Sequence, residues 1–190
     1  MTDNIQKKES QRKMGISARK AMDKEQAMYF SRVISEKLMA YPTFLHAKTI
    51  FSYQPFGGEV DISFFNEYAL QAGKTVAFPI CDGNGHMVAA VPEHSDAWET
   101  GKYGIKAPVK NRSHILDPNS IELIIVPCTV FNGPKKMRIG WGGGYYDRYL
   151  PQCKNATSIA VAYGAQQVND ICCEEWDVPL DAVATESSWY

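Results

Sequence analysis

Short apolar runs separated by turn-forming residues dominate the chain after residue 48. They are rich in β-branched and aromatic residues and are bounded mostly by glycine, proline, asparagine or aspartate, which is typical of β-strands. The predicted strands are residues 49–53, 75–79, 87–91, 121–126 and 158–162. The run 121–126 is the most apolar, as expected for a strand buried on both faces of a parallel sheet.

Helical patterns precede and interrupt these runs. The first forty residues predict two helices, and the second is expected to begin at the N-cap Asp23, with Gln26 three residues later, and to end before Pro42. Its apolar side is formed by Phe30, Ile34, Leu38 and Tyr41. A further helix is expected between Asp61, as its N-cap, and Gly73, which closes it.

Strands that alternate with helices predict an α/β fold. We expect a three-layer α/β/α arrangement around a mostly parallel, Rossmann-like central sheet. The 190 residues contain no internal repeat, low-complexity tract or linker, so a single domain over residues 1–190 is expected. Residues 98–108 show little periodicity and are interpreted as an ordered loop.

One glycine-rich segment departs from this pattern of strands and helices. Between Arg138 and Arg148 lie four glycines within five positions, followed by two tyrosines and Asp147. The apolar run 123–127 precedes the segment, and residues 145–150 are expected to start a helix. Glycine allows positive φ and lets backbone N–H groups approach an anion, and a helix start adds unpaired N–H groups. The segment therefore fits a phosphate-binding loop, with arginines for charge and Asp147 for a magnesium ion.

The residues alone leave alternatives open. The glycine-rich segment is equally compatible with a flexible turn packed under two tyrosines. It has neither the Gly-x-x-x-x-Gly-Lys-Ser/Thr pattern of a P-loop nor the early position of a dinucleotide fingerprint. Near the amino terminus, Lys8, Arg12 and Arg19 fall on one helix face, and composition alone favours a solvated charged face there.

Composition and charge narrow the class of protein. With 45% hydrophobic and 22% charged residues, the balance is that of an ordinary globular protein. A formal net charge of −1 gives no general attraction to nucleic acid or anionic membranes. The polar, basic amino terminus is no secretory signal, and no apolar run is long enough to cross a bilayer. Five cysteines without a C-x-x-C pair indicate reduced thiols, and four scattered histidines lack metal-ligand spacing. We therefore expect a cytoplasmic protein with no nucleic-acid or membrane partner.

The glycine-rich segment resembles the hallmark of one enzyme family. Residues 138–148 read Arg-x-Gly-x-Gly-Gly-Gly-Tyr-Tyr-Asp-Arg, which is similar to the motif of the 5-formyltetrahydrofolate cyclo-ligases, also called 5,10-methenyltetrahydrofolate synthetases. The similarity runs in the same motif order from about Lys8 to Glu186. It implies ATP- and Mg²⁺-dependent conversion of 5-formyltetrahydrofolate into 5,10-methenyltetrahydrofolate, with release of ADP and phosphate. A monomer is expected.

The resemblance also implies roles for individual residues. Arg148 is the implied catalytic residue, and Asp147 and Asp177 are the implied magnesium ligands. Gln54 and Glu59 occupy the positions that bind the folate. The implied ATP site consists of Lys8, Arg12, Arg138, Ile139, Gly140, Trp141, Gly142, Gly143, Gly144, Tyr145 and Tyr146.

Several positions depart from the family pattern, and three of them bear on the site. Ala107 replaces a glutamate, Trp176 replaces a histidine, and Gln11 replaces a leucine beside the amino-terminal arginine. The first two leave open a family member that binds folate or nucleotide without turnover. A sugar-phosphate or CoA-handling enzyme on a similar sheet is the other alternative, and it would use a carboxylate or a thiol directly.

The implied chemistry explains why the chain shows no familiar catalytic pair. An N-formyl carbon is a poor electrophile until its oxygen receives the γ-phosphoryl group of ATP, after which N10 of the same folate attacks. Both nucleophiles belong to the substrate, so no Ser–His or Cys–His pair is required, and none is convincing in the sequence. The protein is expected to align two ligands and to neutralise phosphate charge.

Overall fold

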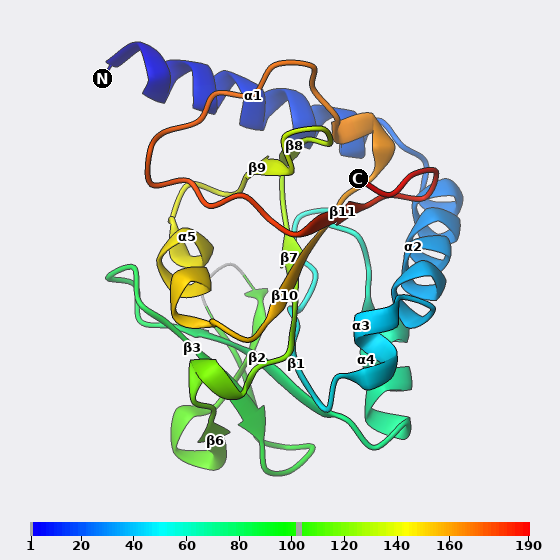
Figure 1. The fold of residues 1–190 in the computed structure, drawn as a ribbon, viewed down its shortest axis with the longest axis vertical. Helices are drawn as coiled ribbons and strands as arrows, with labels where there is room; N and C mark the ends of the chain where they lie inside the picture. The colour runs from blue at the N-terminus through cyan, green and yellow to red at the C-terminus, as the bar shows by residue number, and fades with distance from the viewer. Residues whose placement is uncertain (1, 102–103) are drawn as a thin grey trace.

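A central sheet of seven strands organises the computed structural model, which describes residues 2–101 and 104–190 (Figure 1). The strand order is β11-β10-β7-β1-β2-β3-β6. The parallel strands are β1 (Thr49–Phe51), β2 (Thr75–Cys81), β7 (Leu123–Pro127), β10 (Thr157–Val161) and β11 (Ala182–Ala184). The antiparallel strands at one edge are β3 (Met87–Pro92) and β6 (Ser113–Ile115). The predicted mostly parallel sheet is confirmed.

Helices cover both faces of this sheet. Neighbouring residues of a strand point to opposite faces, so each face has apolar side chains that a helical layer buries. Ile50 packs into the core beneath α2 (Lys24–Met39), α3 (Pro42–His46) and α4 (Ser63–Gln71). Its neighbour Phe51 packs on the other face, against Tyr149 of α5 (Tyr145–Tyr149), with ring centroids 5.2 Å apart. A 3₁₀ turn, η4 (Leu150–Gln152), extends this second helical layer. The three-layer α/β/α arrangement is therefore present, although the second layer is thin.

The helix boundaries follow the signals in the sequence. Asp23 caps α2, accepting a hydrogen bond from the backbone N–H of Gln26 at 2.8 Å. The Asp61 carboxylate accepts from the N–H of Ser63 at 2.9 Å, although Ile62 occupies the N-cap position of α4. Gly73, at φ 74°, follows that helix in the left-handed conformation that ends helices.

The first helix, α1 (Thr2–Lys20), lies across one end of the sheet (Figure 1). It packs against a hairpin of β8 (Val130–Asn132) and β9 (Met137–Ile139) and against the 3₁₀ turn η5 (Gly164–Gln166). The approach is close, since a Cβ atom built on Gly15 lies 1.9 Å from the carbonyl oxygen of Thr129. Glycine at this position therefore sets the distance between α1 and the hairpin.

Two local predictions were wrong. Residues 98–108 form not a plain loop but the hairpin strands β4 (Trp98–Thr100) and β5 (Lys106–Pro108), which are too short to show periodicity. Lys102 and Tyr103 of this segment lie outside the described residues. The strand that enters the glycine-rich segment is β9 and not the run 123–127, because the β8–β9 hairpin intervenes. Two further 3₁₀ turns are η2 (Lys110–Arg112) and η3 (Pro118–Ser120).

The strand order reverses direction between β1 and β7, and we refer to the carboxyl-terminal side of this switch point as the crevice. From β1 the chain crosses through α4 to β2 on one side, whereas β7 is followed on the other side by β10 and then β11. Neighbouring parallel strands whose connections diverge leave a crevice at their carboxyl ends, where open α/β sheets bind ligands. Residues 52–62 follow β1 and residues 128–144 follow β7, so both predicted binding loops arise at this crevice.

Candidate active site

The glycine loop, residues 140–144, leads from β9 into α5 with its backbone N–H groups available. Within the described chain, the N–H groups of residues 141–144 have no hydrogen-bond acceptor. Two loop carbonyls are held by arginines: Arg12 Nε donates to Gly140 O at 2.9 Å, and Arg148 Nη2 donates to Gly143 O. Consecutive unpaired N–H groups beside fixed cations form an arrangement suited to phosphate oxygens.

Glycine is required at two positions of this loop. Gly142 has φ 99° and Gly144 has φ 65°, which side chains rarely adopt. A Cβ atom on Gly142 lies 3.3 Å from Cζ of Arg12, and one on Gly144 lies 2.7 Å from Nη1 of Arg148. Because α5 is a single turn of five residues, the loop itself and its arginines, rather than a long helix dipole, supply the favourable environment for an anion.

The basic face of α1 is turned toward these loops. Lys8 Nζ donates to Asp177 Oδ2 at 2.5 Å, Arg12 holds the glycine loop, and Arg19 Nη1 donates to Cys128 O at 3.3 Å. By contrast, Lys13 is exposed and pairs with Glu9 one helical turn away. The interpretation of this face as solvated was therefore wrong, because the packing of α1 on β8 and β9 carries these residues to the crevice.

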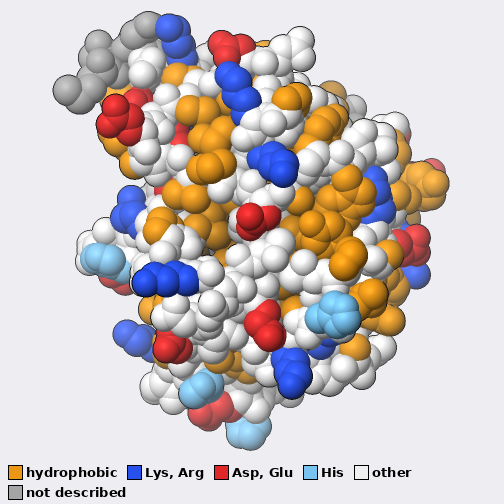
Figure 2. Space-filling view, viewed as in Figure 1, with side chains coloured by type: hydrophobic (Ala, Val, Ile, Leu, Met, Phe, Trp, Pro, Cys, Tyr) orange, Lys and Arg blue, Asp and Glu red, His pale blue; other side chains and the backbone are white. Residues whose placement is uncertain are grey.

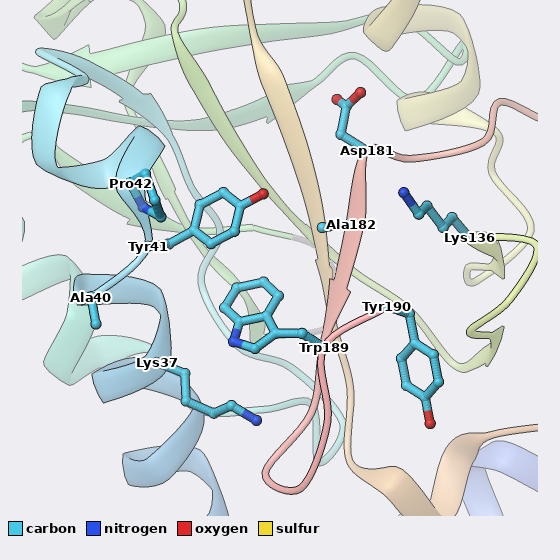
Figure 3. A pocket seen from close by; sticks show the side chains of 9 residues that line it. All are labelled: Lys37, Ala40, Tyr41, Pro42, Lys136, Asp181, Ala182, Trp189 and Tyr190. Atoms are coloured by element: carbon cyan, nitrogen blue, oxygen red, sulfur yellow. The ribbon is translucent and has the colours of Figure 1, made fainter.

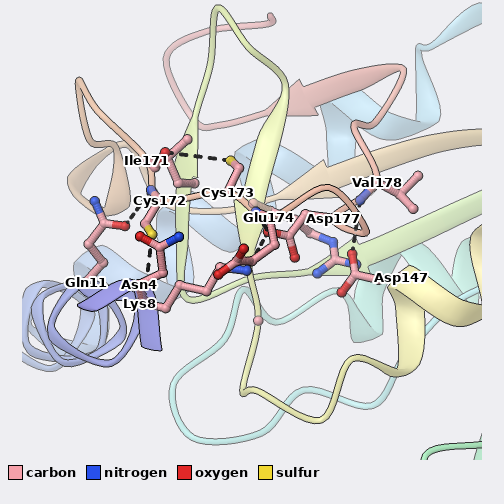
Figure 4. Close-up of polar contacts among 12 residues, drawn as sticks. Asn4, Lys8, Gln11, Asp147, Ile171, Cys172, Cys173, Glu174, Asp177 and Val178 are labelled. Atoms are coloured by element: carbon pink, nitrogen blue, oxygen red, sulfur yellow. Dashed lines mark hydrogen bonds and ion pairs between the residues drawn. The ribbon is translucent and has the colours of Figure 1, made fainter. Parts of the chain in front are cut away.

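Asp147 of α5 and Asp177 of the segment before β11 lie near each other (Figure 4). Asp147 Oδ1 lies 3.2 Å from Arg138 Nη2 and accepts from Val178 N at 3.4 Å, and Asp177 Oδ2 accepts from Glu174 N at 2.7 Å. The second oxygen of each aspartate has no hydrogen-bond donor in the described regions.

These two free oxygens fit a magnesium ion carried by phosphate. In the described residues, no three histidine, cysteine or acidic side chains cluster as a metal site. Mg²⁺ bound to a triphosphate needs only one or two carboxylates, with water and phosphate oxygens completing the shell. Asp147 and Asp177 therefore suit that role better than that of an all-protein metal cage.

Glu59 connects the two binding loops. Its carboxylate accepts hydrogen bonds from Trp141 Nε1 of the glycine loop at 2.7 Å and from Phe56 N at 3.0 Å. The side chain is buried, and burial raises the pKa of Glu59, opposed by these two hydrogen bonds and by the charge of Arg19. Gln54 is half-buried at the start of the same loop. The predicted folate positions and the predicted phosphate loop thus meet at the Trp141–Glu59 contact.

Arg138 and Tyr146 present unsatisfied polar atoms beside the glycine loop. Nε of Arg138 and the hydroxyl of Tyr146 are buried without a hydrogen-bond partner in the described chain, and Arg138 Cζ lies 5.4 Å from the Tyr146 ring centroid. Burial raises the pKa of the Tyr146 hydroxyl, which stays protonated. Buried polar groups are nearly always paired, so these two point to a ligand that supplies acceptors. Ile139, in contrast, is buried in β9, where it packs with Val130 and Ile171 just before the loop begins.

Arg148 contacts the turn between β2 and β3, which the sequence did not indicate as part of the site. Its Nε donates to Gly85 O at 2.8 Å, so the turn between β2 and β3 lies against the glycine loop. The guanidinium also lies 5.8 Å from the Tyr145 ring centroid. The turn-forming residues 82–85 predicted this turn, but no local pattern indicated that it would reach the site.

Two of the family departures, Ala107 and Trp176, lie in different surroundings. Ala107 is half-buried in β5, opposite Glu99 of β4. Trp176 is 67% exposed and directly precedes Asp177. The Trp176 ring therefore lies at the surface, next in sequence to Asp177. Because the ring is exposed, it can be replaced without disturbing the core to test its effect on ligand binding.

A cavity of about 450 Å³ lies away from the predicted residues (Figure 3). It is lined by α2, α3, β11 and the carboxyl-terminal residues, where Tyr41 and Trp189 stack with ring centroids 4.7 Å apart. Figure 2 shows hydrophobic side chains gathered on this face near β11 and α3. None of the predicted site residues lines the cavity, so its size alone does not make it the active site.

No helix in the described parts of the chain is long and apolar enough to cross a bilayer.

Comparison with known proteins agrees with the geometry. The profile of the 5-formyltetrahydrofolate cyclo-ligase family matches residues 4–186. The 5-formyltetrahydrofolate cyclo-ligase of Escherichia coli K12 is 28% identical over 173 residues, covering 89% of this chain and 94% of the relative. That of Haemophilus influenzae is 32% identical over 138 residues, covering 70% and 73%.

Solved structures give the same result. The 5,10-methenyltetrahydrofolate synthetase of Mycoplasma pneumoniae superposes with a TM-score of 0.78 at 27% identity, covering 94% of this chain and 98% of the other. The 5,10-methenyltetrahydrofolate synthetase of Aquifex aeolicus gives 0.83 at 27% identity, covering 96% and 91%.

Proposed function

The chain belongs to the 5-formyltetrahydrofolate cyclo-ligase family, and from this membership we propose that it uses ATP and Mg²⁺ to cyclise 5-formyltetrahydrofolate to 5,10-methenyltetrahydrofolate, releasing ADP and phosphate. The observation that carries the proposal is the contact between the two loops of the crevice. A loop with available N–H groups and flanking arginines is joined through Trp141 to the buried Glu59. A phosphate donor and a second ligand can thus meet at one place.

The glycine loop has the task of holding the phosphates. Its N–H groups bind non-bridging oxygens, while Lys8 and Arg12 add charge from α1. Arg148 Nη1 has no acceptor in the described chain and is proposed to neutralise the transferring phosphoryl group. Such fixed cations lower the barrier because phosphoryl transfer depends on positioning and on charge stabilisation.

The bond changes require no protein nucleophile. The formyl oxygen attacks the γ-phosphorus, and the bond from that phosphorus to ADP breaks. N10 then attacks the activated carbon, the carbon–oxygen bond breaks, and phosphate leaves with the former formyl oxygen while N10 loses its proton. The residues around the crevice keep the two ligands in line, which is worth several orders of magnitude in rate.

The magnesium ion would be held by the free oxygens of Asp147 and Asp177. When bound, Mg²⁺ supplies charge neutralisation on the phosphate oxygens. Lys8 and Arg138 orient these carboxylates through the ion pairs already described, at 2.5 and 3.2 Å.

Glu59 and Gln54 are proposed to hold the folate. Glu59 can accept hydrogen bonds from ring or exocyclic N–H groups of the ligand, and such bonds are strong because the carboxylate is charged and shielded from water. The Trp141 and Phe56 hydrogen bonds fix its orientation before the ligand arrives.

The alternatives make different demands on the chain. An enzyme that uses a thiol directly needs an accessible thiolate, but burial raises the pKa of Cys128 to about 12 and that of Cys81 and Cys153 to about 11. A family member that binds without turnover remains compatible with Ala107 and Trp176. We further propose a cytoplasmic monomer that acts on small molecules and has no nucleic-acid partner.

The deciding experiment follows the absorbance of the methenyl product. Purified protein is mixed with 5-formyltetrahydrofolate and Mg-ATP, with parallel reactions lacking nucleotide or metal. We expect product and ADP in equal amounts, and only in the complete reaction. Product without nucleotide would overturn the proposal, and folate binding without product would identify the non-catalytic alternative.

A further inference from the structure

Arg19 is a buried cation at the carboxyl-terminal end of α1. Its side chain is only 4% exposed, and Nη1 makes the one hydrogen bond that the guanidinium has in the described chain, to Cys128 O at 3.3 Å. Nε and Nη2 are buried without acceptors. A buried charge is costly unless an opposite charge or an aromatic face compensates it. The surroundings of Arg19 therefore indicate what it does.

The guanidinium lies between the two binding loops. Its Cζ is 5.0 Å from the Trp141 ring centroid, close enough for a cation–π interaction. A Cβ atom built on Gly57 lies 2.9 Å from Cζ2 of Trp141 and 3.7 Å from Nη2 of Arg19. The turn that leads to Glu59 thus rests directly on the Arg19–Trp141 pair, and Trp141 donates to Glu59 at 2.7 Å.

We propose that Arg19 is a positioning residue of the folate subsite, which keeps the Glu59 carboxylate ionised and fixes the indole that orients it. The proposal rests on the folate-binding role of Glu59 proposed above. Arg19 acts through Glu59 and Trp141 and needs no contact with the ligand.

The titratable groups that face Glu59 in the described chain include one cation, Arg19. Tyr53 after β1, Tyr146 from α5 and Cys128 after β7 lie near the carboxylate, and burial raises the pKa of each, so all three are neutral at neutral pH. In the described chain, Arg19 is the cation whose charge lowers the pKa of Glu59.

Removing the charge of Arg19 should therefore change the pKa of Glu59 in a defined direction. Burial favours the protonated form of Glu59, and a cation opposes that effect. Without the cation, Glu59 takes up its proton at a higher pH, and less of it is ionised when the folate binds. A purely structural arginine would leave this titration unchanged.

The Trp141 indole N–H offers a direct readout, because it donates to the titrating carboxylate. In protein labelled with ¹⁵N-tryptophan, its NMR signal is identified by its loss in Trp141→Phe and followed against pH without any ligand. We expect Arg19→Gln to raise the titration midpoint, because the variant loses the cation that favours the ionised carboxylate. Lys13→Gln, which removes an exposed charge from the same helix, should leave it unchanged. An unchanged midpoint in folded Arg19→Gln overturns the proposal.

Arg19→Lys provides a second test that keeps the charge. Its midpoint should stay close to that of the parent, and a midpoint raised clearly above that of the parent contradicts the proposal even if Arg19→Gln does not fold.

The pH dependence of KM for 5-formyltetrahydrofolate links the inference to function. Its acid limb should move upward in Arg19→Gln by the same amount as the NMR midpoint. A parent protein without activity would refute the proposed function and leave the NMR test intact. An active parent whose indole titration ignores Arg19 would refute this inference alone.

Discussion

Two aspartates at the site, Asp147 and Asp177, are each paired with a basic residue that is largely buried. Arg138 has a side chain that is 4% exposed, whereas that of its partner Asp147 is 17% exposed. Lys8 and Asp177 are each 12% exposed. Each aspartate uses one carboxylate oxygen for its basic partner and leaves the other for a ligand. The ion pair and the proposed metal contact therefore involve different atoms of the same residue.

Asp147→Asn tests this division. Asparagine keeps an acceptor for Arg138 but loses the charge, so we expect the free energy of unfolding to fall by about 1–3 kcal/mol. As a magnesium ligand, Asp147 contributes anionic oxygen that a hard cation prefers, so turnover should fall by roughly a hundredfold or more. Denaturant unfolding and steady-state assays measure the two effects, and partial rescue by high magnesium would support direct ligation.

The control for Asp147 is Asp170→Asn. The Asp170 side chain is 94% exposed and pairs with Lys135 at 3.6 Å, so the same chemical change should leave both stability and turnover nearly unchanged. A stable Asp147→Asn variant with near-normal turnover would remove Asp147 from the metal site.

Glu59→Gln tests whether Glu59 binds the folate or only supports the two loops. The charged hydrogen bonds to folate are each worth about 1.5–3 kcal/mol, so folate binding should weaken about tenfold or more while ATP affinity stays similar. Isothermal titration with each ligand measures this difference. Equal losses for both ligands would show that Glu59 supports the loops instead of the folate.

The same variant should change how stability depends on pH. Because burial raises the folded-state pKa of Glu59, its contribution to stability is present below the unfolded pKa and is lost as pH rises through the folded pKa. Glutamine has no such loss. The stability of Glu59→Gln relative to the parent should therefore increase as pH rises above about 4.5, the usual range of glutamate. Thermal unfolding from pH 5 to 8 measures the trend, and a constant difference would contradict it.

Among the structural elements, the turn between β2 and β3 contributes most unexpectedly to the site. Gly83 and Gly85 both have positive φ, at 82° and 93°, so alanine strains the backbone similarly at either position. A Cβ atom on Gly85 lies 2.6 Å from Arg148 Nη2, whereas one on Gly83 meets nothing within 4 Å. Alanine at the two glycines therefore differs mainly in whether the new side chain meets Arg148, which makes Gly83 a matched control for Gly85.

We expect Gly83→Ala and Gly85→Ala to lose similar stability, each about 1 kcal/mol. Only Gly85→Ala should lower ATP-dependent turnover, by roughly tenfold, because it displaces the proposed catalytic guanidinium. Melting curves and initial rates compare the pair. Equal rates in both variants would mean that the Arg148–Gly85 contact has no role in catalysis.

α1 offers a second test at the level of an element. Because a Cβ atom on Gly15 lies 1.9 Å from Thr129 O, Gly15→Ala must push α1 away from the hairpin, with an expected loss of about 1–3 kcal/mol. The shift carries Lys8 and Arg12 with it, so KM for ATP should rise. Ser17→Ala, at an exposed position of the same helix, should leave KM unchanged, and ATP kinetics that tolerate Gly15→Ala would separate α1 from the nucleotide site.

Sequence reasoning succeeded where local chemistry determines structure and failed where distant packing does. The continuous apolar runs 49–53 and 121–126 predict strands, and Asp23 is predicted as the N-cap of α2 because capping depends only on neighbouring residues. The three-residue strands β4, β5, β8 and β9 carry no comparable signal. Arg19 has the same spacing signal as Lys8 and Arg12, but only the docking of α1 shows that it lies against Trp141.

At the level of the whole molecule, the crevice between β1 and β7 explains why the site residues come from all parts of the sequence. The strand order brings the loop after β1 beside the loop after β7, while α1 and the segment around Asp177 cover their ends. Alternating strands and helices predicted the fold class, but periodicity alone does not fix strand order. The family resemblance therefore indicated which residues belong to the site, whereas the topology explains how residues far apart in the sequence lie together there.

The sheet edges lead to a prediction about assembly. The edge strands β11 and β6 are only three residues long, and Ala184 of β11 already pairs with Trp189 of the carboxyl-terminal segment. Short or covered edges offer little backbone for pairing with another chain. Since both proposed binding loops arise from one chain, a second copy is not needed to complete the site. Light scattering should give the mass of one chain across a wide concentration range, with or without ATP and folate. A concentration-dependent dimer whose formation parallels activity would contradict the monomer prediction and would require a search for the site across two chains.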